Sequence, residues 1–475
     1  MIPCALDNRD VNNRHINPLP DTDPRLQRRY YELVSSHLAH AHSVAAGTKP
    51  PASLERPFAA VQGAWRFYLN PRLWLGKLVE PLLQCAREDV PGICEQFVLV
   101  ALDWSNLHLN GHDGKTDRVK LAHGKDMGYE LLTALAIGDR TGAPIAPLCL
   151  ELRAADGVHS TRVSKPFPAP SVLDSLEPVM RHVQGLDLGK TPVYLIDREA
   201  DSVGHYRNWG AAGLLFLIRA DDARRVLHQG EERRLGEVAD ELKRCGNLVL
   251  SGPVDYQGRP ATAYVAETLV VLHRPARTHR VDPQTGKARH KNIAGPALPL
   301  RLIVSEIRDQ KGEVLARWLL LSNLPKEVQA SRMALWYYWR WRIESCHKLL
   351  KGAGQQVESW QQETAKALSR RLLVAAMAGV VVWRLAREEG AAAEEMRQVL
   401  VRLSGRQMKR GKKARRFTEP ALLAGLGVLV PMLELLRSYS VQELRELAEA
   451  ALPGLIRPLS NGGSGRAKRP PAKPA

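Results

Sequence analysis

Two aspartates in the middle of the chain, Asp103 and Asp197, each stand immediately after a short apolar run. The runs are Phe97 to Leu102 and Val193 to Ile196, and unbroken apolar runs of this length are typical of strands buried on both faces. We interpret a carboxylate that ends a buried strand as a site residue. Carboxylate oxygens are the ligands that hard cations such as Mg²⁺ and Mn²⁺ prefer, which indicates metal-assisted chemistry.

A third carboxylate, Glu344, stands among cations and aromatic residues. At 100° per residue, a helix would gather four unlike side chains within an arc of roughly 60°: Tyr337, Arg340, Glu344 and Lys351. Trp341 and Lys348 flank this arc. Such a face suits a metal-bound phosphodiester, because it adds phosphate-binding cations and base-stacking rings to one carboxylate. The alternative is an exposed helix with ordinary ion pairs, such as Arg340 with Glu344.

Three carboxylates satisfy a divalent cation better than two, which would leave it under-coordinated. In two-metal sites the ions lie about 3.5–4 Å apart, and they activate the attacking oxygen and stabilise the leaving oxygen in a displacement at phosphorus. The sequence therefore predicts that Asp103, Asp197 and Glu344 are catalytic and hold two Mg²⁺ ions per active site. Mn²⁺ is expected to substitute.

The charge balance of the chain favours a polyanionic partner. Lys and Arg number 68 against 50 Asp and Glu, a formal charge of +18 over 475 residues. Nucleic acid is the default partner for such an excess, and a merely soluble basic enzyme is the alternative. The six cysteines are scattered without framework spacing, which indicates a reducing cytoplasm.

The chain shows no secretory signal at its N-terminus. Its longest apolar run, Leu372 to Trp383, has 12 residues, fewer than the roughly 18 that a membrane span needs. We therefore expect a cytoplasmic, nucleoid-associated bacterial protein without a membrane partner.

The elements that must position the three acids alternate in type, which predicts an α/β fold. Strand-like patterns alternate with turns and one helical pattern over residues 97–102, 129–137, 145–152, 171–184 (the helix) and 193–196. The turn-forming residues 138–142 predict a hairpin between the second and third strands. Further strands are expected at 214–218, 248–254, 263–272 and 298–304, with a polar, basic loop at 274–292.

Helical patterns dominate both ends of the chain. Residues 1–70 are predicted helical, with Asp23 as a cap and Pro24 in the first turn, followed by the exposed cations Arg25 and Arg28. Residues 331–385 and 393–458 are also predicted helical, except for a charged stretch at 406–416 and a break at Pro431. The Gly-, Pro- and Lys-rich residues 461–475 are expected to be disordered.

The spacing of Tyr337, Arg340, Glu344 and Lys351 resembles the Tyr-Arg-Glu-Lys signature of the IS-four group of bacterial insertion-sequence DDE transposases. The similarity extends to Arg-Trp-Arg-Ile-Glu at 340–344, His-Lys at 347–348 and Asp-Arg-Glu-Ala-Asp at 197–201. It also covers residues 63–71, which include Arg66, and Trp-Leu-Leu-Leu at 318–321, so it spans most of the chain.

The resemblance implies roles for individual residues. Asp103, Asp197 and Glu344 would be the DDE triad, and Tyr337, Arg340 and Lys351 would grip a phosphate near the transposon end. The remaining implied DNA contacts are Lys348, Arg219, Arg66, Arg25, Arg28 and the two tryptophans at positions that hold or displace a flipped base, Trp318 and Trp341. A core role is an equally good interpretation for either tryptophan.

The resemblance also implies an architecture. A helical DNA-binding domain would occupy residues 1–72, and an RNase H-like catalytic domain residues 73–385, with a β-rich insertion at about 220–315. A C-terminal helical dimerisation region would follow at 386–460, and then the basic tail at 461–475. The expected partners are double-stranded DNA, as terminal repeats and target, and a second copy of the chain. Residues 360–390 could form a dimerisation helix or be buried in their own monomer.

The implied activity is cut-and-paste transposition. Hydrolysis would free a 3′-hydroxyl, which would attack the opposite strand to form a hairpin; after the hairpin opens, the 3′-hydroxyl would attack target DNA. Two alternatives stay open. One is a catalytically inactive DNA-binding relative or inhibitor, and the other is a metal-dependent endonuclease unrelated to transposition.

Overall fold

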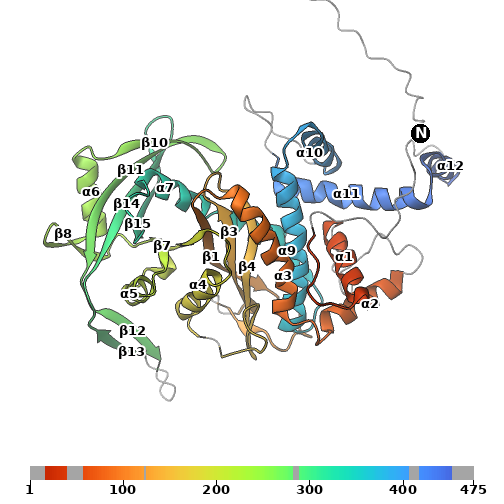
Figure 1. Ribbon diagram of the computed structural model, residues 1–475, viewed down its shortest axis with the longest axis horizontal. Helices are drawn as coiled ribbons and strands as arrows, with labels where there is room; N and C mark the ends of the chain where they lie inside the picture. The colour runs from red at the N-terminus through yellow and green to blue at the C-terminus, as the bar shows by residue number, and fades with distance from the viewer. Residues whose placement is uncertain are drawn as a thin grey trace, which may run out of the picture.

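The computed structural model describes residues 16–39, 57–121, 125–168, 170–281, 288–405 and 417–451. The protein is mixed α/β, as the sequence predicts, and one large mixed sheet runs through it with helices packed against it (Figure 1). The charged stretch at 406–416 and the basic tail at 461–475 lie outside the described residues.

The large sheet contains 13 strands of the described chain. Its spatial order is β5 (Gly157–Ser160), β4 (Pro144–Ala154), β3 (Met127–Gly138), β1 (Phe97–His108), β6 (Thr191–Ile196), β7 (Leu215–Arg219), β15 (Val314–Ser322), β14 (Leu298–Arg308), β11 (Arg259–Leu272), β8 (Arg225–His228) and β9 (Glu231–Arg234). In addition, β2 (Val119–Lys120) pairs with β3, and β10 (Val249–Tyr256) pairs with β11.

The predicted hairpin at residues 138–142 is confirmed, since β3 and β4 are antiparallel neighbours. In contrast, β1, β6 and β7 run parallel to one another in the centre of the sheet. The buried apolar residues of these strands explain their position, because a central strand is covered on both faces and needs no polar side.

The prediction that the first strand ends at Asp103 is wrong. β1 continues to His108, and its pairing with β3 runs unbroken from Val98–Gly138 to His108–Gly128. Only the burial changes at Asp103, from fully buried to partly exposed. The apolar pattern stops there because the strand leaves the core, while its backbone hydrogen bonds go on. Asp197, in contrast, directly follows β6 as predicted.

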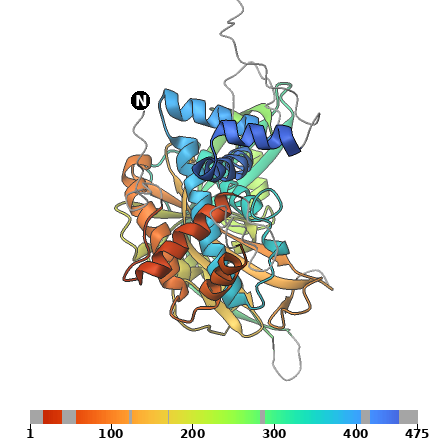
Figure 2. The same cartoon turned by 90° about the vertical axis from the view of Figure 1, so that its right-hand side faces the viewer.

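Three helices of the N-terminal part pack along one long helix, α9 (Ala365–Arg387), in both views of the fold (Figures 1 and 2). They are α1 (Pro24–Leu38), α2 (Pro57–Leu69) and α3 (Leu75–Ile93). Asp23 caps α1 as predicted, accepting the backbone N–H of Arg25 at 2.7 Å. The apolar run of α9 is buried inside the monomer, so of the two interpretations of residues 360–390 the structure supports burial.

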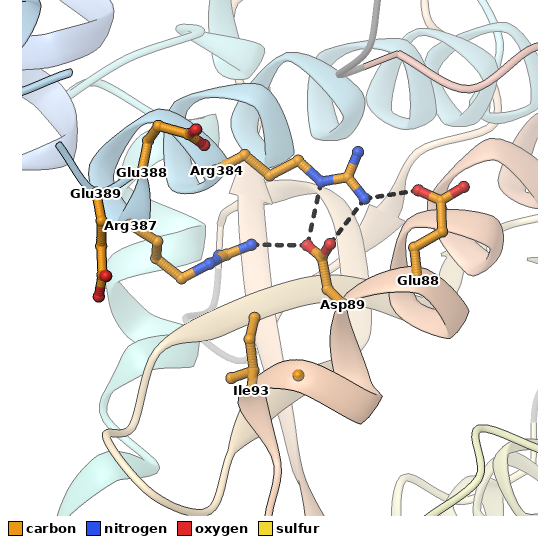
Figure 3. Close-up of a pocket in the computed structure, with 8 residues that line it drawn as sticks. Glu88, Asp89, Ile93, Arg384, Arg387, Glu388 and Glu389 are labelled. Carbon is orange, nitrogen blue, oxygen red and sulfur yellow. Dashed lines mark hydrogen bonds and ion pairs between the residues drawn. The ribbon is translucent and has the colours of Figure 1, made fainter. Parts of the chain in front are cut away.

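Buried and half-buried ion pairs join α3 to the end of α9 (Figure 3). The guanidinium of Arg384 contacts both Asp89 and Glu88 at 2.9 Å, and that of Arg387 contacts Asp89 at 2.7 Å. These carboxylates raise the pKa of Arg384 against the opposing effect of burial. An open cavity of about 560 Å³ adjoins the cluster, whose cations are already matched by α3 carboxylates.

The second half of the sheet consists of long antiparallel strands. The predicted basic loop at 274–292 is wrong in part, because two strands, β12 (Ala276–Val281) and β13 (Ala288–Ile293), pair across it as a separate ribbon. This ribbon continues the β11–β14 hairpin beyond the large sheet and projects from the body below α5 (Figure 1). Its polar composition concealed it, since neither of its faces has an apolar alternation.

The remaining helices follow or connect these strands: α4 (Leu176–Gln184), α5 (Val203–Ala211), α6 (Leu235–Arg244), α7 (Ala330–Trp339), α8 (Arg342–Leu350), α10 (Ala391–Leu403), α11 (Glu419–Ser438) and α12 (Val441–Ala451). The predicted break at Pro431 is wrong, because this proline lies inside α11.

Among the described helices, α11 alone is long and apolar enough to cross a membrane by length and composition, and most of it is exposed. One such helix is weak evidence of a membrane span.

Candidate active site

Asp103 and Asp197 lie level with each other on neighbouring parallel strands. In the β1–β6 pairing Ala101 stands opposite Leu195, and each of these residues precedes its aspartate by two positions. Parallel strands point the same way, so equal offsets bring the two carboxylates to the same edge of the core. The local sequence produces this arrangement because each apolar run is buried up to the residue before its aspartate.

Arg340 links the third acid to this pair. Its Nη1 lies 3.4 Å from Oδ2 of Asp103, and its Nη2 lies 3.3 Å from Oε1 of Glu344. Asp197 is near enough to raise the pKa of Arg340 and that of Asp103. The structure therefore brings together the three acids that the sequence singled out, around one buried guanidinium.

A break between two helices places Arg340 and Glu344. α7 ends at Trp339 and α8 begins at Arg342, so the continuous helix expected over 336–351 is absent, and the predicted arc is wrong in geometry. Arg340 lies at the break itself. Glu344 is in the first turn of α8, where the helix N-terminus favours a negative charge.

The charge balance of the site is unfavourable for an ionised Asp103. The pKa of Asp103 is raised to about 6, mainly by burial and also by the neighbouring Asp197 and Glu344, and this value already includes the lowering effect of Arg340 and of the Trp104 backbone N–H. One guanidinium thus offsets only part of the negative charge that three carboxylates bring.

Aromatic rings pack behind Arg340. The ring of Tyr337 lies 5.9 Å from the guanidinium carbon of Arg340 and meets the ring of Trp318 edge-on at 5.4 Å. Both rings are buried, and burial raises the pKa of Tyr337 to about 12. For Trp318 the structure thus supports the core role that the sequence left open. Arg219, at the end of β7, is close enough to lower the pKa of Tyr337.

Lys351 lies just past the end of α8, outside the helical arc predicted for it. Its ammonium donates to the backbone carbonyl of Asn106 on β1 and lies 3.5 Å from the carboxylate of Glu358. The same carboxylate accepts the backbone N–H of His108 at 3.1 Å. Lys351 is therefore held against the strand that carries Asp103, and Glu358, a residue that the sequence did not single out, holds it there.

Trp341 and Lys348 line a cavity of about 400 Å³ between α8 and the β10–β11 turn, and none of the three acids lines it. The side chain of Trp341 is 41% exposed. Tyr256, Tyr338 and Trp339 also line this cavity. An exposed indole beside cations is available to stack on a planar ligand.

The predicted N-terminal contacts are not part of this site. Arg25 and Arg28 lie exposed on α1, and Arg66 lies exposed on α2. In Figure 1 these helices lie on the far side of α9 from the long strands β11 to β15. A role in binding a long ligand stays a prediction for all three.

A buried histidine fixes α8 over the sheet. Nε2 of His347 lies 3.1 Å from Oγ1 of Thr133, and Thr133 stands directly opposite Asp103 in the β1–β3 pairing. Burial lowers the pKa of His347 to about 4, so its ring is neutral near pH 7. Sequence reasoning missed this positioning pair, because only the strand register shows that Thr133 and Asp103 are partners.

The three acids suit Mg²⁺ in kind, because all are hard oxygen ligands and their mutual repulsion would be relieved by a cation. In the described part of the chain, however, no three Asp, Glu, His or Cys side chains lie close enough to hold a metal ion. Arg340 stands between Asp103 and Glu344 and separates their carboxylates. The three acids therefore fit Mg²⁺ in chemical kind but not in the spacing that the structure shows.

No protein-family model matches the chain.

Proposed function

We propose that the chain is a DDE transposase that cuts and rejoins DNA at transposon ends. The observation that carries this proposal is the convergence of Asp103, Asp197 and Glu344 on Arg340, two of the acids level on adjacent parallel strands. The formal charge of +18 supports a nucleic-acid substrate. The proposed partners are double-stranded terminal repeats and target DNA.

The strand arrangement supports an RNase H-like core as the setting of this chemistry. An antiparallel run of β4, β3 and β1 continues into the parallel strands β6 and β7, and the acids lie on β1, after β6 and on α8. Between β7 and α7, the strands β8 to β14 correspond to the proposed β-rich insertion at about 220–315. This insertion joins the same sheet, because β15 pairs with β7.

Asp103, Asp197 and Glu344 are the residues that would hold two Mg²⁺ ions. When bound, such ions supply Lewis-acid assistance to displacement at phosphorus. In the proposal Arg340 exchanges a carboxylate for a phosphate oxygen of the DNA, which its forked donors match equally well. Tyr337 buttresses Arg340, and Lys351 neutralises a second phosphate oxygen beside β1.

The proposed reaction proceeds by hydrolysis, hairpin formation on the opposite strand, hairpin opening and transfer of the 3′-hydroxyl to target DNA. In the proposal the exposed indole of Trp341 and the adjacent Lys348 would hold an unstacked base and its phosphate during the hairpin step.

Cleavage of the chain's own flanking DNA tests the proposal. The substrate is a linear fragment carrying the gene with its natural flanks, incubated with Mg²⁺ or Mn²⁺. The wild type is expected to release the gene-bearing fragment with defined ends and to join it to a second plasmid, whereas Glu344→Gln does neither. Glu313→Gln, an exposed acid in the β14–β15 turn, is the matched control. Equal cleavage and joining by the wild type and Glu344→Gln would contradict the proposal.

One observation favours a second function, that of a catalytically inactive DNA-binding relative. It is the guanidinium of Arg340 between Asp103 and Glu344, which keeps the acids apart. Thermal unfolding separates the two functions: a transposase should gain stability from millimolar Mg²⁺ or Mn²⁺, and the gain should be absent from Glu344→Gln. An inactive relative should bind duplex DNA and show no metal-dependent gain.

A further inference from the structure

A basic region lies near the candidate active site, at the base of the β12–β13 ribbon. It is a cleft of about 770 Å³ bounded by α5, the loop after β7 and the ends of β12 and β13. We call it the basic cleft. Its polar lining residues are Asp221, Arg224, Arg225, Arg274, Arg277 and Asn292.

The basic cleft has more positive charge than its own acids can neutralise. Four guanidinium groups and one carboxylate line it, a formal charge of +3. Outside the lining, Glu232 is shared between Arg225 at 2.9 Å and Arg274 at 3.8 Å, and it also contacts His273 at 2.7 Å. Within the described residues no carboxylate pairs with Arg277. Such an excess of donors indicates an anionic ligand.

A short segment, residues 197–201, joins the candidate active site to the basic cleft. The buried carboxylate of Asp201, four residues after Asp197, accepts the backbone N–H of Asp221 at 2.9 Å and the Nε–H of Arg224 at 3.0 Å. On the same segment, Arg198 lies 3.6 Å from Asp221. A polymer with a phosphate at Asp197 would therefore reach the basic cleft within a few phosphates.

The lining chemistry distinguishes the kind of ligand. Among the described residues no aromatic ring lines the basic cleft, unlike the cavity beside Trp341, so these residues offer no surface on which an unpaired base can stack. Arg225, Arg274 and Arg277 are exposed, and Arg225 and Arg274 share the single carboxylate of Glu232. Guanidinium groups spaced along a cleft and a projecting ribbon suit the regular phosphates of a duplex.

We propose that the basic cleft binds the phosphate backbone of duplex DNA next to the scissile bond, without reading its sequence. This inference rests on the proposed function, since it identifies a second contact of the same substrate. Arg225 and Arg277 supply the direct contacts. Arg224 is a positioning residue, because its guanidinium is engaged by Asp201 and ties the cleft to the segment after Asp197.

The double variant Arg225→Gln/Arg277→Gln tests this inference by salt-dependent binding. Affinity for a mixed-sequence linear duplex is measured in EDTA over a range of KCl concentrations. Each lost phosphate contact lowers the slope of log affinity against log salt by about 0.9, so the double variant should show a slope shallower by about 2. The control Arg87→Gln/Arg181→Gln removes the same charge from exposed ion pairs on α3 and α4 and should keep the wild-type slope.

The outcomes separate this inference from the proposed function. If the wild type binds and cleaves DNA and the cleft variant keeps its slope, the inference is wrong and the transposase proposal stands. If the wild type binds no duplex at all, both are wrong. An equal loss for the matching single strand would overturn the assignment to duplex DNA. The melting temperature of the cleft variant, expected to equal that of the control, shows that both fold.

Discussion

At the scale of single residues, the contacts of Arg340 determine how the acids of the candidate site are arranged. It is 6% exposed and contacts two carboxylates, and its Nε has no hydrogen-bond partner among the described residues. A buried guanidinium with an unused donor is poised to take another oxygen ligand. In the proposed function, the same side chain that contacts Asp103 and Glu344 would bind a phosphate of the DNA.

Replacing Asp103 by Asn should stabilise the metal-free protein at pH 7.5 by about 1–3 kcal/mol. Burial raises the pKa of Asp103 to about 6 from an ordinary value of 3.8. A carboxyl group with a raised pKa stabilises the fold fully below pH 3.8 and loses that contribution as pH rises through 6. At pH 7.5 the ionised group therefore destabilises the wild type, while the amide of the variant carries no charge.

Urea unfolding in EDTA measures this difference. The gain of Asp103→Asn over the wild type should shrink as pH falls from 7.5 towards 4, and Asp187→Asn, at an exposed position, should show neither effect. A variant less stable than the wild type at pH 7.5 would mean that Arg340 neutralises the site fully.

The identity of the acids was predictable from sequence, and their arrangement was not. Asp103 and Asp197 stand out because each directly follows an apolar run. Glu344 stands out because it is a carboxylate among cations and aromatic residues. The guanidinium bridge from Arg340 depends on a helix break at 340–341, which no helix-breaking residue marks. The bond from Lys351 to Asn106 depends on a strand that continues past the end of its apolar pattern.

At the scale of elements, α8 must be held in register with β1 and β3 for Glu344 to meet Asp103. The hydrogen bond between Thr133 and His347 provides this register. Thr133→Val should leave the buried imidazole of His347 without a partner, at a cost of about 1–3 kcal/mol in stability. Because α8 then shifts relative to β1, we expect DNA cleavage to fall about tenfold, with little change in DNA affinity.

The chain contains a matched control for this prediction. Nε2 of His228 and Oγ1 of Thr268 form an equivalent contact of 3.1 Å in the second half of the sheet. Thr268→Val should destabilise the protein to a similar extent and leave cleavage unchanged. Equal loss of cleavage in both variants would show that general stability, and not the position of α8, limits activity.

The docking of α1 should depend on pH through His37. Its buried ring contacts Oε1 of Gln355 at 2.6 Å and the hydroxyl of Tyr68 at 3.3 Å. Burial and the nearby Arg371 lower the pKa of His37 to about 3. Below pH 6.5 the imidazole of His37 therefore binds a proton in the unfolded chain and stays neutral in the folded chain. The contribution of His37 to stability is full above pH 6.5 and is lost as pH falls.

The loss should approach about 1.4 kcal/mol per pH unit below pH 6.5. Comparison of the wild type with His37→Gln isolates it, because all other titrating groups are shared. Between pH 6.5 and 5 the stability of the wild type should fall by about 2 kcal/mol more than that of the variant. Parallel pH profiles would mean that α1 undocks before His37 is protonated.

The type of each element, helix or strand, was the most predictable feature of the fold, and the pairing of strands was the least predictable. The runs at 129–137, 145–152 and 193–196 became strands close to their predicted bounds, because apolar runs between turn residues have few alternatives. The β12–β13 ribbon and the extension of β1 escaped prediction. Backbone pairing with a neighbouring strand stabilises these polar segments. This pairing leaves no alternation of apolar and polar residues in the sequence, so a pattern search misses it.

At the scale of the whole molecule, the described chain leaves α11 largely uncovered. α11 exposes Val428, Met432, Leu433 and Leu436, while α9 is buried within the monomer. An exposed apolar helix face is typical of surfaces that contact another protein chain. We therefore place the proposed dimer contact on α11, inside the C-terminal region 386–460, and assign α9 to the core.

Replacing two leucines of this face, Leu433→Asp/Leu436→Asp, should disrupt the proposed dimer, which would join two DNA ends. Burying a leucine contributes about 1.5–3 kcal/mol, and a symmetric contact would lose both residues from both chains, so the dimer dissociation constant should rise more than about 100-fold. Light scattering with and without end-bearing DNA measures the mass of the assembly.

The variant should still bind single ends, because the cations of α1, α8 and the basic cleft are unchanged, yet cleavage should fail wherever it requires two ends. The control Leu250→Asp/Leu269→Asp carries the same charges on exposed leucines of β10 and β11 and should dimerise normally. A dimer that survives the α11 substitutions would place the contact outside this helix.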